Sequence, residues 1–307
     1  MLRNLSLCRW YPALAVILLI ACNRSKPESK RPSFKAVEGI KFIEVRREFD
    51  TGLSFSEQGF QQIPEWTLYF LPGDSVKIYS PFEKRYIHYP IYFDHGQVIN
   101  FAREFLRVKN ISRDSIVLQL LRVQARVVNQ DLSKVYMRFY SEDYIKNVLR
   151  THPDTLRKPD RRDTVFIKSL VDRTKRHPNI GDSLFAARQP VSLKSKVDWI
   201  LVVKKKLAKS DIDYRASDEY LYPEYTVNIQ NAYKDFSYTF TAYVDHHGKI
   251  TVGRFASIEE DFVAPQRRVM QGIVDVYLHR FLEITPGQTM GMSHPTEITL
   301  HLRGTKN

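Results

Sequence analysis

Short apolar segments rich in β-branched and aromatic residues recur along most of the chain, and turn-forming residues separate them. Strands at this spacing, with no long helix between them, are typical of an antiparallel sandwich or barrel. The sequence therefore predicts a mainly β fold with some α-helix. In the first half the predicted strands are 39–49, 66–71, 75–80, 85–93, 97–110, 115–128 and 134–140.

One pair of these segments has a familiar pattern. In FLRVKNISRDSIVLQLLRV, residues 105–123, an apolar strand ends in Lys-Asn, a polar turn follows, and a second apolar strand returns. This pattern resembles a strand pair found in immunoglobulin-like sandwich domains. The resemblance implies an antiparallel, immunoglobulin-like β-sandwich over residues 36–150. Ser141 is expected to cap a short helix that ends this domain.

Residues 151–189 are polar and contain three prolines, with a fourth at Pro190, which predicts a linker region. A second domain, β-rich α+β, is predicted over 190–307. Its clearest element is a hairpin in which FSYTFTAYV and KITVGRF flank the turn Asp-His-His-Gly. Alternation in the first of these strands predicts one buried face. The residues on that face are Phe236, Phe240, Ala242 and Val244, with Tyr238 between them.

One amphipathic helix is predicted near the C-terminus, over residues 265–284, and is expected to pack on the sheet. Pro265 suits its first turn, and Pro286-Gly287 would close its end. A last strand follows, with Ile298, Leu300 and Leu302 pointing inward. The residues expected to form the apolar face of the helix are Val269, Ile273, Val276, Tyr277, Arg280 and Phe281.

The N-terminus has the organisation of a secretory signal. Arg3 and Arg9 precede an uncharged apolar run over 11–21, after which the chain becomes polar. At about 1.5 Å per residue, an apolar run of this length spans roughly half of a ~30 Å hydrocarbon core. Residues 1–21 are therefore predicted to be a signal peptide and not a transmembrane helix.

The sequence Leu19-Ile20-Ala21-Cys22 resembles the lipobox of bacterial lipoproteins. The resemblance implies cleavage between Ala21 and Cys22, with lipid attached to Cys22. A signal peptide cut elsewhere, with an incidental cysteine, is the alternative. Cys8 lies in the removed segment, so the mature chain would have no thiol for a disulfide, a zinc site or a nucleophile.

The resemblance also bears on localisation. Asn23 stands where an Asp retains such lipoproteins at the inner membrane, which favours the outer membrane. The segment after Cys22 is basic instead of acidic, which favours the periplasmic face, with the cell surface as the alternative. Residues 22–35 are predicted to form a flexible basic tether. The expected partners are the membrane, through the anchor, and an envelope protein or polymer.

Cleavage would remove two arginines and no acid, leaving 45 basic and 34 acidic residues and a net charge of +11. Such an excess of positive charge favours anionic binding partners. We expect no nucleic acid among them, because an exported lipoprotein meets little of it.

The sequence contains no motif for a catalytic serine, a phosphate-binding loop or a zinc-protease helix. No catalytic residue, cofactor or metal site is predicted. The pairs Asp94-His95 and Asp245-His246-His247 have ligand chemistry, but adjacent turn residues seldom converge on one ion. Their expected role is turn formation.

Residues 285–297 form a loop with two glycines, two methionines, two prolines and a histidine. Loops held by a rigid scaffold often carry binding residues, so Met290, Met292 and His294 are candidate binding residues. The alternative is a connecting loop whose methionines fill gaps in the core.

These features favour an envelope lipoprotein that acts as a binding or assembly module. Aromatic clusters such as RYIHYPIYF suit sugar stacking or protein contact. The alternative from another class is a periplasmic glycan hydrolase, which would need a pair of carboxylates in a cleft.

Overall fold

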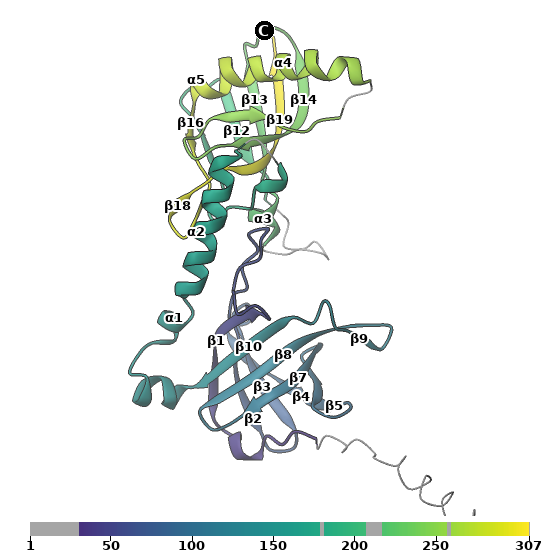
Figure 1. Ribbon diagram of the computed structural model, residues 1–307, viewed down its shortest axis with the longest axis vertical. Helices are drawn as coiled ribbons and strands as arrows, with labels where there is room; N and C mark the ends of the chain where they lie inside the picture. The colour runs from purple at the N-terminus through teal and green to yellow at the C-terminus, as the bar shows by residue number, and fades with distance from the viewer. Residues whose placement is uncertain (1–30, 179–180, 207–216, 257–258, 307) are drawn as a thin grey trace, which may run out of the picture.

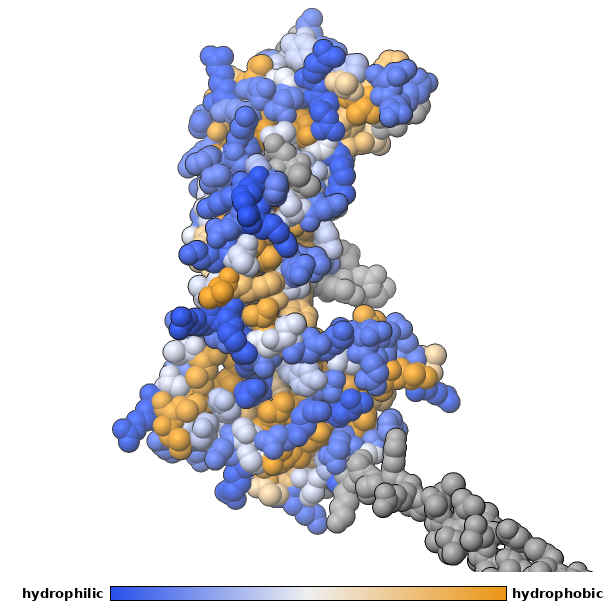
Figure 2. Space-filling model, viewed as in Figure 1, coloured by the Kyte–Doolittle hydropathy of each residue, from blue (hydrophilic) through white to orange (hydrophobic). Residues whose placement is uncertain are grey.

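A computed structural model describes residues 31–178, 181–206, 217–256 and 259–306 of the chain. Figure 1 shows an elongated molecule with an N-terminal lobe and a C-terminal lobe at opposite ends, joined by a narrower neck. The fold is mainly β, as the sequence predicts. In Figure 2, apolar side chains gather on the viewed face of the neck.

Ten strands form the N-terminal lobe, and all of their pairings are antiparallel. The sheet order is β4-β3-β2-β1-β10-β8-β7-β6-β5, and β9 pairs with β8. The strands are β1 (Lys41–Phe49), β2 (Thr67–Leu71), β3 (Ser75–Ser80), β4 (Arg85–Pro90), β5 (Tyr92–Phe93), β6 (Val98–Phe101), β7 (Glu104–Ile111), β8 (Ser115–Gln124), β9 (Val127–Asn129) and β10 (Val135–Ser141).

The two edges of this sheet, β4 and β5, follow one another in the chain with only Ile91 between them. The sheet therefore curls into a near-barrel. The immunoglobulin-like sandwich expected for residues 36–150 is not confirmed, because the strands form one continuous ladder and not two facing sheets. The strand pair that suggested it is real, since β7 and β8 pair as an antiparallel hairpin.

Alternating side chains of these strands fill the interior of the near-barrel. Phe42, Phe70, Phe101 and Phe139 are almost completely buried there, together with aliphatic residues of β2, β3, β7 and β8. A short 3-10 turn, η2 (Lys35–Val37), precedes β1 and adds Val37 to the same core.

The neck is formed by the segment predicted to be a polar linker and by residues 50–65, which leave the N-terminal lobe between β1 and β2. The linker segment contains α1 (Pro153–Leu156) and the long α2 (Arg161–Arg176). Before them, Ser141 accepts a hydrogen bond from the Tyr144 N–H, as predicted, and a π-helical turn, η3 (Tyr144–Val148), follows.

A capping box starts α2. The Asp160 carboxylate accepts from the N–H of Arg162 and Asp163, and the Asp163 carboxylate accepts from the Asp160 N–H. Asp163 is fully buried and also accepts from Arg46 of β1 at 2.7 Å and from the Ser54 N–H at 2.8 Å. One carboxylate thus joins the N-terminal lobe, the 50–65 segment and α2.

The neck has a small apolar core of its own. Its buried members come from the 50–65 segment, from α2 and from the segment before β11. Gly59 has φ +89°, and a Cβ there would lie 2.3 Å from the Ala186 carbonyl, so the close approach of these two segments requires glycine. The buried residues of this core are Phe55, Ile167, Leu170, Val171 and Phe185.

Five strands form the main sheet of the C-terminal lobe, in the order β12-β13-β19-β14-β15. Only the β13–β19 pairing is parallel. The predicted hairpin is confirmed, and so is the burial of Ile298, Leu300 and Leu302. The elements of this lobe are η4 (Gly181–Ser183), β11 (Ser192–Ser195), β12 (Ile200–Lys204), α3 (Asp218–Leu221), β13 (Glu224–Gln230), β14 (Phe236–Val244), β15 (Ile250–Val252), η5 (Glu260–Phe262), α4 (Val263–Ile273), η6 (Val274–Leu278), α5 (His279–Phe281), β16 (Leu282–Thr285), β17 (Gln288–Thr289), β18 (Met292–Ser293) and β19 (Thr296–Thr305).

The predicted C-terminal helix is confirmed as α4, η6 and α5, which cover one face of this sheet (Figure 1). Its predicted apolar face was partly wrong, since Val269 and Val276 are 40% and 55% exposed. The π-helical turn η6 widens the helix and changes which side chains meet the sheet. The helix also ends earlier than expected, because β16 begins at Leu282. The buried helix residues are Met270, Ile273, Val274 and Leu278.

The same helix covers the outer edge of β15. The N–H groups of Ile250 and Val252 donate to His279 Nε2 at 2.8 Å and to Gln271 Oε1 at 2.9 Å. Their carbonyls accept from Gln271 and Arg267. Side chains therefore take the place of a further strand, which protects this edge from pairing with another chain.

We expect Asp163→Ala to lower the free energy of unfolding by about 3–5 kcal/mol, because it leaves Arg46 Nη1 and the N–H groups of Ser54 and Asp160 without their buried acceptor. Asp172, exposed on the same helix, is the matched control, and Asp172→Ala should change it by less than about 0.5 kcal/mol. Chemical denaturation followed by circular dichroism measures both. Equal effects of the two substitutions would contradict the role given to Asp163.

Candidate functional site

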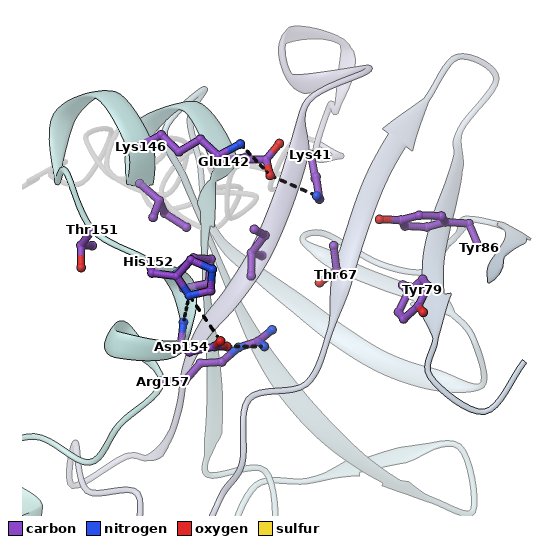
Figure 3. Close-up of a pocket in the computed structure, with 13 residues that line it drawn as sticks. Lys41, Thr67, Tyr79, Tyr86, Glu142, Lys146, Thr151, His152, Asp154 and Arg157 are labelled. Atoms are coloured by element: carbon purple, nitrogen blue, oxygen red, sulfur yellow. Dashed lines mark hydrogen bonds and ion pairs between the residues drawn. The ribbon is translucent and has the colours of Figure 1, made fainter. Parts of the chain in front are cut away.

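A cleft of about 350 Å³ lies on the N-terminal lobe, between strands β1 to β4 and the segment from Glu142 to Arg157 that follows β10. Figure 3 shows its two walls: charged side chains on one side and two tyrosines on the other. Ile43, Ile145 and Thr67 also line it. The volume is at the lower end of the range of roughly 300–1,000 Å³ found for small-ligand sites.

Glu142 lies at the centre of the upper part of the charged wall. Its carboxylate pairs with Lys41 at 3.1 Å and with Lys146 at 3.2 Å. The hydrogen bond from Lys41, helped by Lys146, lowers the pKa of Glu142, while partial burial opposes the shift. Glu142 therefore stays ionised and serves as a hydrogen-bond acceptor.

Asp154 organises the lower part of the same wall. Its carboxylate lies 3.3 Å from His152 Nδ1 and 3.7 Å from Arg157 Nη1. Arg157 is held in place from behind, because its Nε donates to the Glu44 carbonyl of β1 at 2.9 Å. The β1 backbone thus fixes the position of a cleft cation.

The opposite wall is aromatic. Tyr79 and Tyr86 form a cross-strand pair of β3 and β4, with ring centroids 5.3 Å apart in an edge-to-face arrangement. Tyr69 contacts Tyr86 in the same way from β2. Burial, with Tyr69 adding to the effect, raises the pKa of Tyr86 to about 12, so this phenol remains a neutral donor over the physiological range.

The cleft combines ring faces with ionised donors and acceptors, which suits binding. Acid catalysis of glycan hydrolysis needs a carboxyl group whose pKa is raised. The pKa of Glu142 is shifted the other way. Burial does raise the pKa of Glu104, but that residue lies on β7, on the far side of β10 and β8 from β1.

The candidate loop 285–297 is a tight hairpin of β17 and β18 against the neck. Met292 packs on the neck core, and His294 is fully buried, stacked on Phe185 with ring centroids 3.8 Å apart. Its two nitrogens meet Thr289 Oγ1 and the Pro295 carbonyl. Of the three predicted residues only Met290, at 36% exposed, faces solvent. The binding role remains a prediction.

Ala21 and Cys22 lie outside the described residues, as does the rest of the signal peptide. Asp245 forms the predicted turn, since its carboxylate accepts from the N–H of His247 and Lys249. In the part of the chain that the structure describes, no three His, Cys, Asp or Glu side chains gather to hold a metal ion.

Sequence reasoning did not find the cleft. It noted the aromatic segment that contains Tyr86, but not the pairing of Tyr86 with Tyr79. A signal was present: tyrosines at the adjoining ends of two strands, facing one another across a short turn. No sequence pattern of this kind identifies Glu142 or Asp154, which only the tertiary structure brings into the cleft.

No family model matches the chain, and no curated protein is similar enough to count as a relative. Among the described residues, no helix is both long and apolar enough to cross a membrane.

The pKa of His294 is lowered to about 4, chiefly by burial and also by nearby Lys175, while the Pro295 carbonyl opposes the shift. The unfolded chain, with a histidine pKa of about 6.5, binds this proton more readily. Stability from neutral His294 is therefore complete above about pH 6.5 and is lost as the pH falls toward 4.

We expect the free energy of unfolding to fall by about 2 kcal/mol between pH 7.5 and 5 because of this residue. His294→Gln should be less stable at pH 7.5 but should lack this part of the pH dependence. Denaturant titrations of both proteins at the two pH values measure the difference. An identical change in the free energy of unfolding between the two pH values for both proteins would contradict the lowered pKa of His294, because it would mean that folding does not shift this pKa.

Proposed function

We propose that this chain is a lipid-anchored module of the bacterial cell envelope that binds a protein or an envelope polymer through the cleft of its N-terminal lobe. The cleft carries the proposal, because it joins an aromatic wall to a wall of ionised donors and acceptors. Sites that recognise polar partners commonly combine these features.

The anchor in this proposal is Cys22, after cleavage behind Ala21, as the lipobox-like sequence implies. A tether from residue 22 would lead to the N-terminal lobe. Arg31 pairs there with Asp74, in the turn between β2 and β3, and its guanidinium lies 3.4 Å from the centre of the Phe93 ring. The proposed location is the periplasmic face of the outer membrane, with the cell surface as the alternative.

The binding role is tested by photo-crosslinking in the native membranes. A photoreactive phenylalanine analogue replaces Thr151, which lines the cleft, or Tyr233, an exposed residue of the C-terminal lobe. We expect a reproducible adduct from position 151 that is missing from position 233. Equal labelling at the two positions, or none at either, would contradict a role for the cleft.

The anchor is tested separately. We expect Cys22→Ala to give an uncleaved or mislocalised precursor, because the acylated thiol would be absent. Each buried acyl methylene contributes about 0.8 kcal/mol to membrane binding, so a variant without the acyl chains loses this contribution. Membrane fractionation and intact mass spectrometry measure this, and a lipidated product of unchanged mass would refute the assignment.

A further inference from the structure

We infer that the ligand of the cleft is a saccharide chain that is neutral or carries few charges. This inference rests on the proposed function and names the class of partner. Three properties of the cleft carry it: the balance of its charges, the geometry of its tyrosines, and the burial of the apolar side chains beneath it.

The charged groups of the cleft largely compensate one another. Three cations, Lys41, Lys146 and Arg157, face two carboxylates, Glu142 and Asp154. Glu142 lies between Lys41 and Lys146, and Asp154 lies beside Arg157 and the ring of His152. Both carboxylates would repel a polyanion, and all three cations would repel a cationic ligand. Hydroxyl groups can bond to either sign without breaking these pairs.

The tyrosines supply the complementary surface. Tyr79 and Tyr86 are 37% and 36% exposed, so part of each ring is accessible from the cleft, while Tyr69 packs against Tyr86 and orients it. A pyranose ring has an apolar face of C–H groups and a rim of hydroxyls. That division matches tyrosine rings facing a wall of ionised donors and acceptors.

An extended peptide fits less well. Peptides commonly add a strand to an open sheet edge or place apolar side chains in a groove. Strands β1, β2 and β3 each already have two neighbours in the sheet, whereas β4, which carries Tyr86, pairs only with β3 and forms a sheet edge. The apolar residues beneath the cleft, Ile43 and Ile145, are buried at 6% and 0% exposure. The cleft therefore offers no apolar groove to a peptide, and strand addition could occur only at the outer edge of β4.

The volume of about 350 Å³ limits how much of the chain is held. It suits about one or two sugar rings, with the remainder extending into solvent. Binding of a small segment of a long polymer would be weak for each site. We expect dissociation constants between about 10 µM and 1 mM.

The test uses the full-length lipidated protein in detergent and an array of oligosaccharides. The array holds neutral hexose and N-acetylhexosamine chains with their uronic-acid and phosphate-bearing counterparts. We expect retention of neutral or singly charged chains. Because both partners are nearly neutral, affinity should change less than about twofold between roughly 50 and 500 mM NaCl.

Substitutions of the cleft tyrosines test whether the saccharide binds in the cleft. Tyr79→Ala and Tyr86→Ala should each weaken it about tenfold or more, whereas Tyr86→Phe, which keeps the ring, should cost at most about threefold. Tyr92→Ala is the matched control, since Tyr92 is an exposed tyrosine of the same lobe outside the cleft. Thermal melting of each variant separates a loss of binding from a loss of folding.

Retention of no oligosaccharide, a preference for highly charged chains, or binding unchanged in the tyrosine variants would each overturn the inference. Capture of a protein from position 151, with no saccharide retained, would overturn it and leave the proposed function standing. The reverse result, saccharide retention without any adduct in membranes, would support the saccharide assignment while contradicting the envelope role.

Discussion

Two buried carboxylates, Glu44 on β1 and Asp163 on α2, hold the N-terminal lobe and the neck together. Asp163 binds Arg46 and two backbone N–H groups, while Glu44 binds Arg47 through both oxygens and accepts from the N–H of Glu65 and Trp66. Both are fully buried, so the cost of desolvation is offset only if every one of these partners stays in place. These hydrogen bonds and ion pairs therefore hold segments that are distant in sequence next to one another.

The residues that make these hydrogen bonds and ion pairs lie at an irregularity in β1. The register of β1 against β10 shifts between Glu44 and Arg46, which is a bulge that allows neighbouring arginines to bind different partners. Arg46 reaches α2, and Arg47 turns to Glu44. Through the Glu44 carbonyl, β1 also holds Arg157. The neck and the charged wall of the cleft therefore depend on the same few residues.

Elements with strong local patterns were predicted well. The hairpin of β14 and β15 and the inward residues of β19 follow directly from alternation. The helix over α4 to α5 was predicted, but the face it buries was predicted only in part, because a π-helical turn alters the spacing. The immunoglobulin-like sandwich was not confirmed for another reason. A strand pair is local, whereas one continuous curled sheet depends on pairing between strands distant in sequence, such as β1 and β10.

By itself the sequence determined where strands and turns form, because β-branched and aromatic runs between Gly, Pro, Asn and Asp act within a few residues. It also carries the N-terminal pattern from which a lipid anchor is proposed. Only the tertiary structure decided that Lys41, Tyr86, Glu142 and Arg157 share one cleft and that His294 is buried. These placements result from long-range burial of charged and apolar groups, which no local pattern encodes.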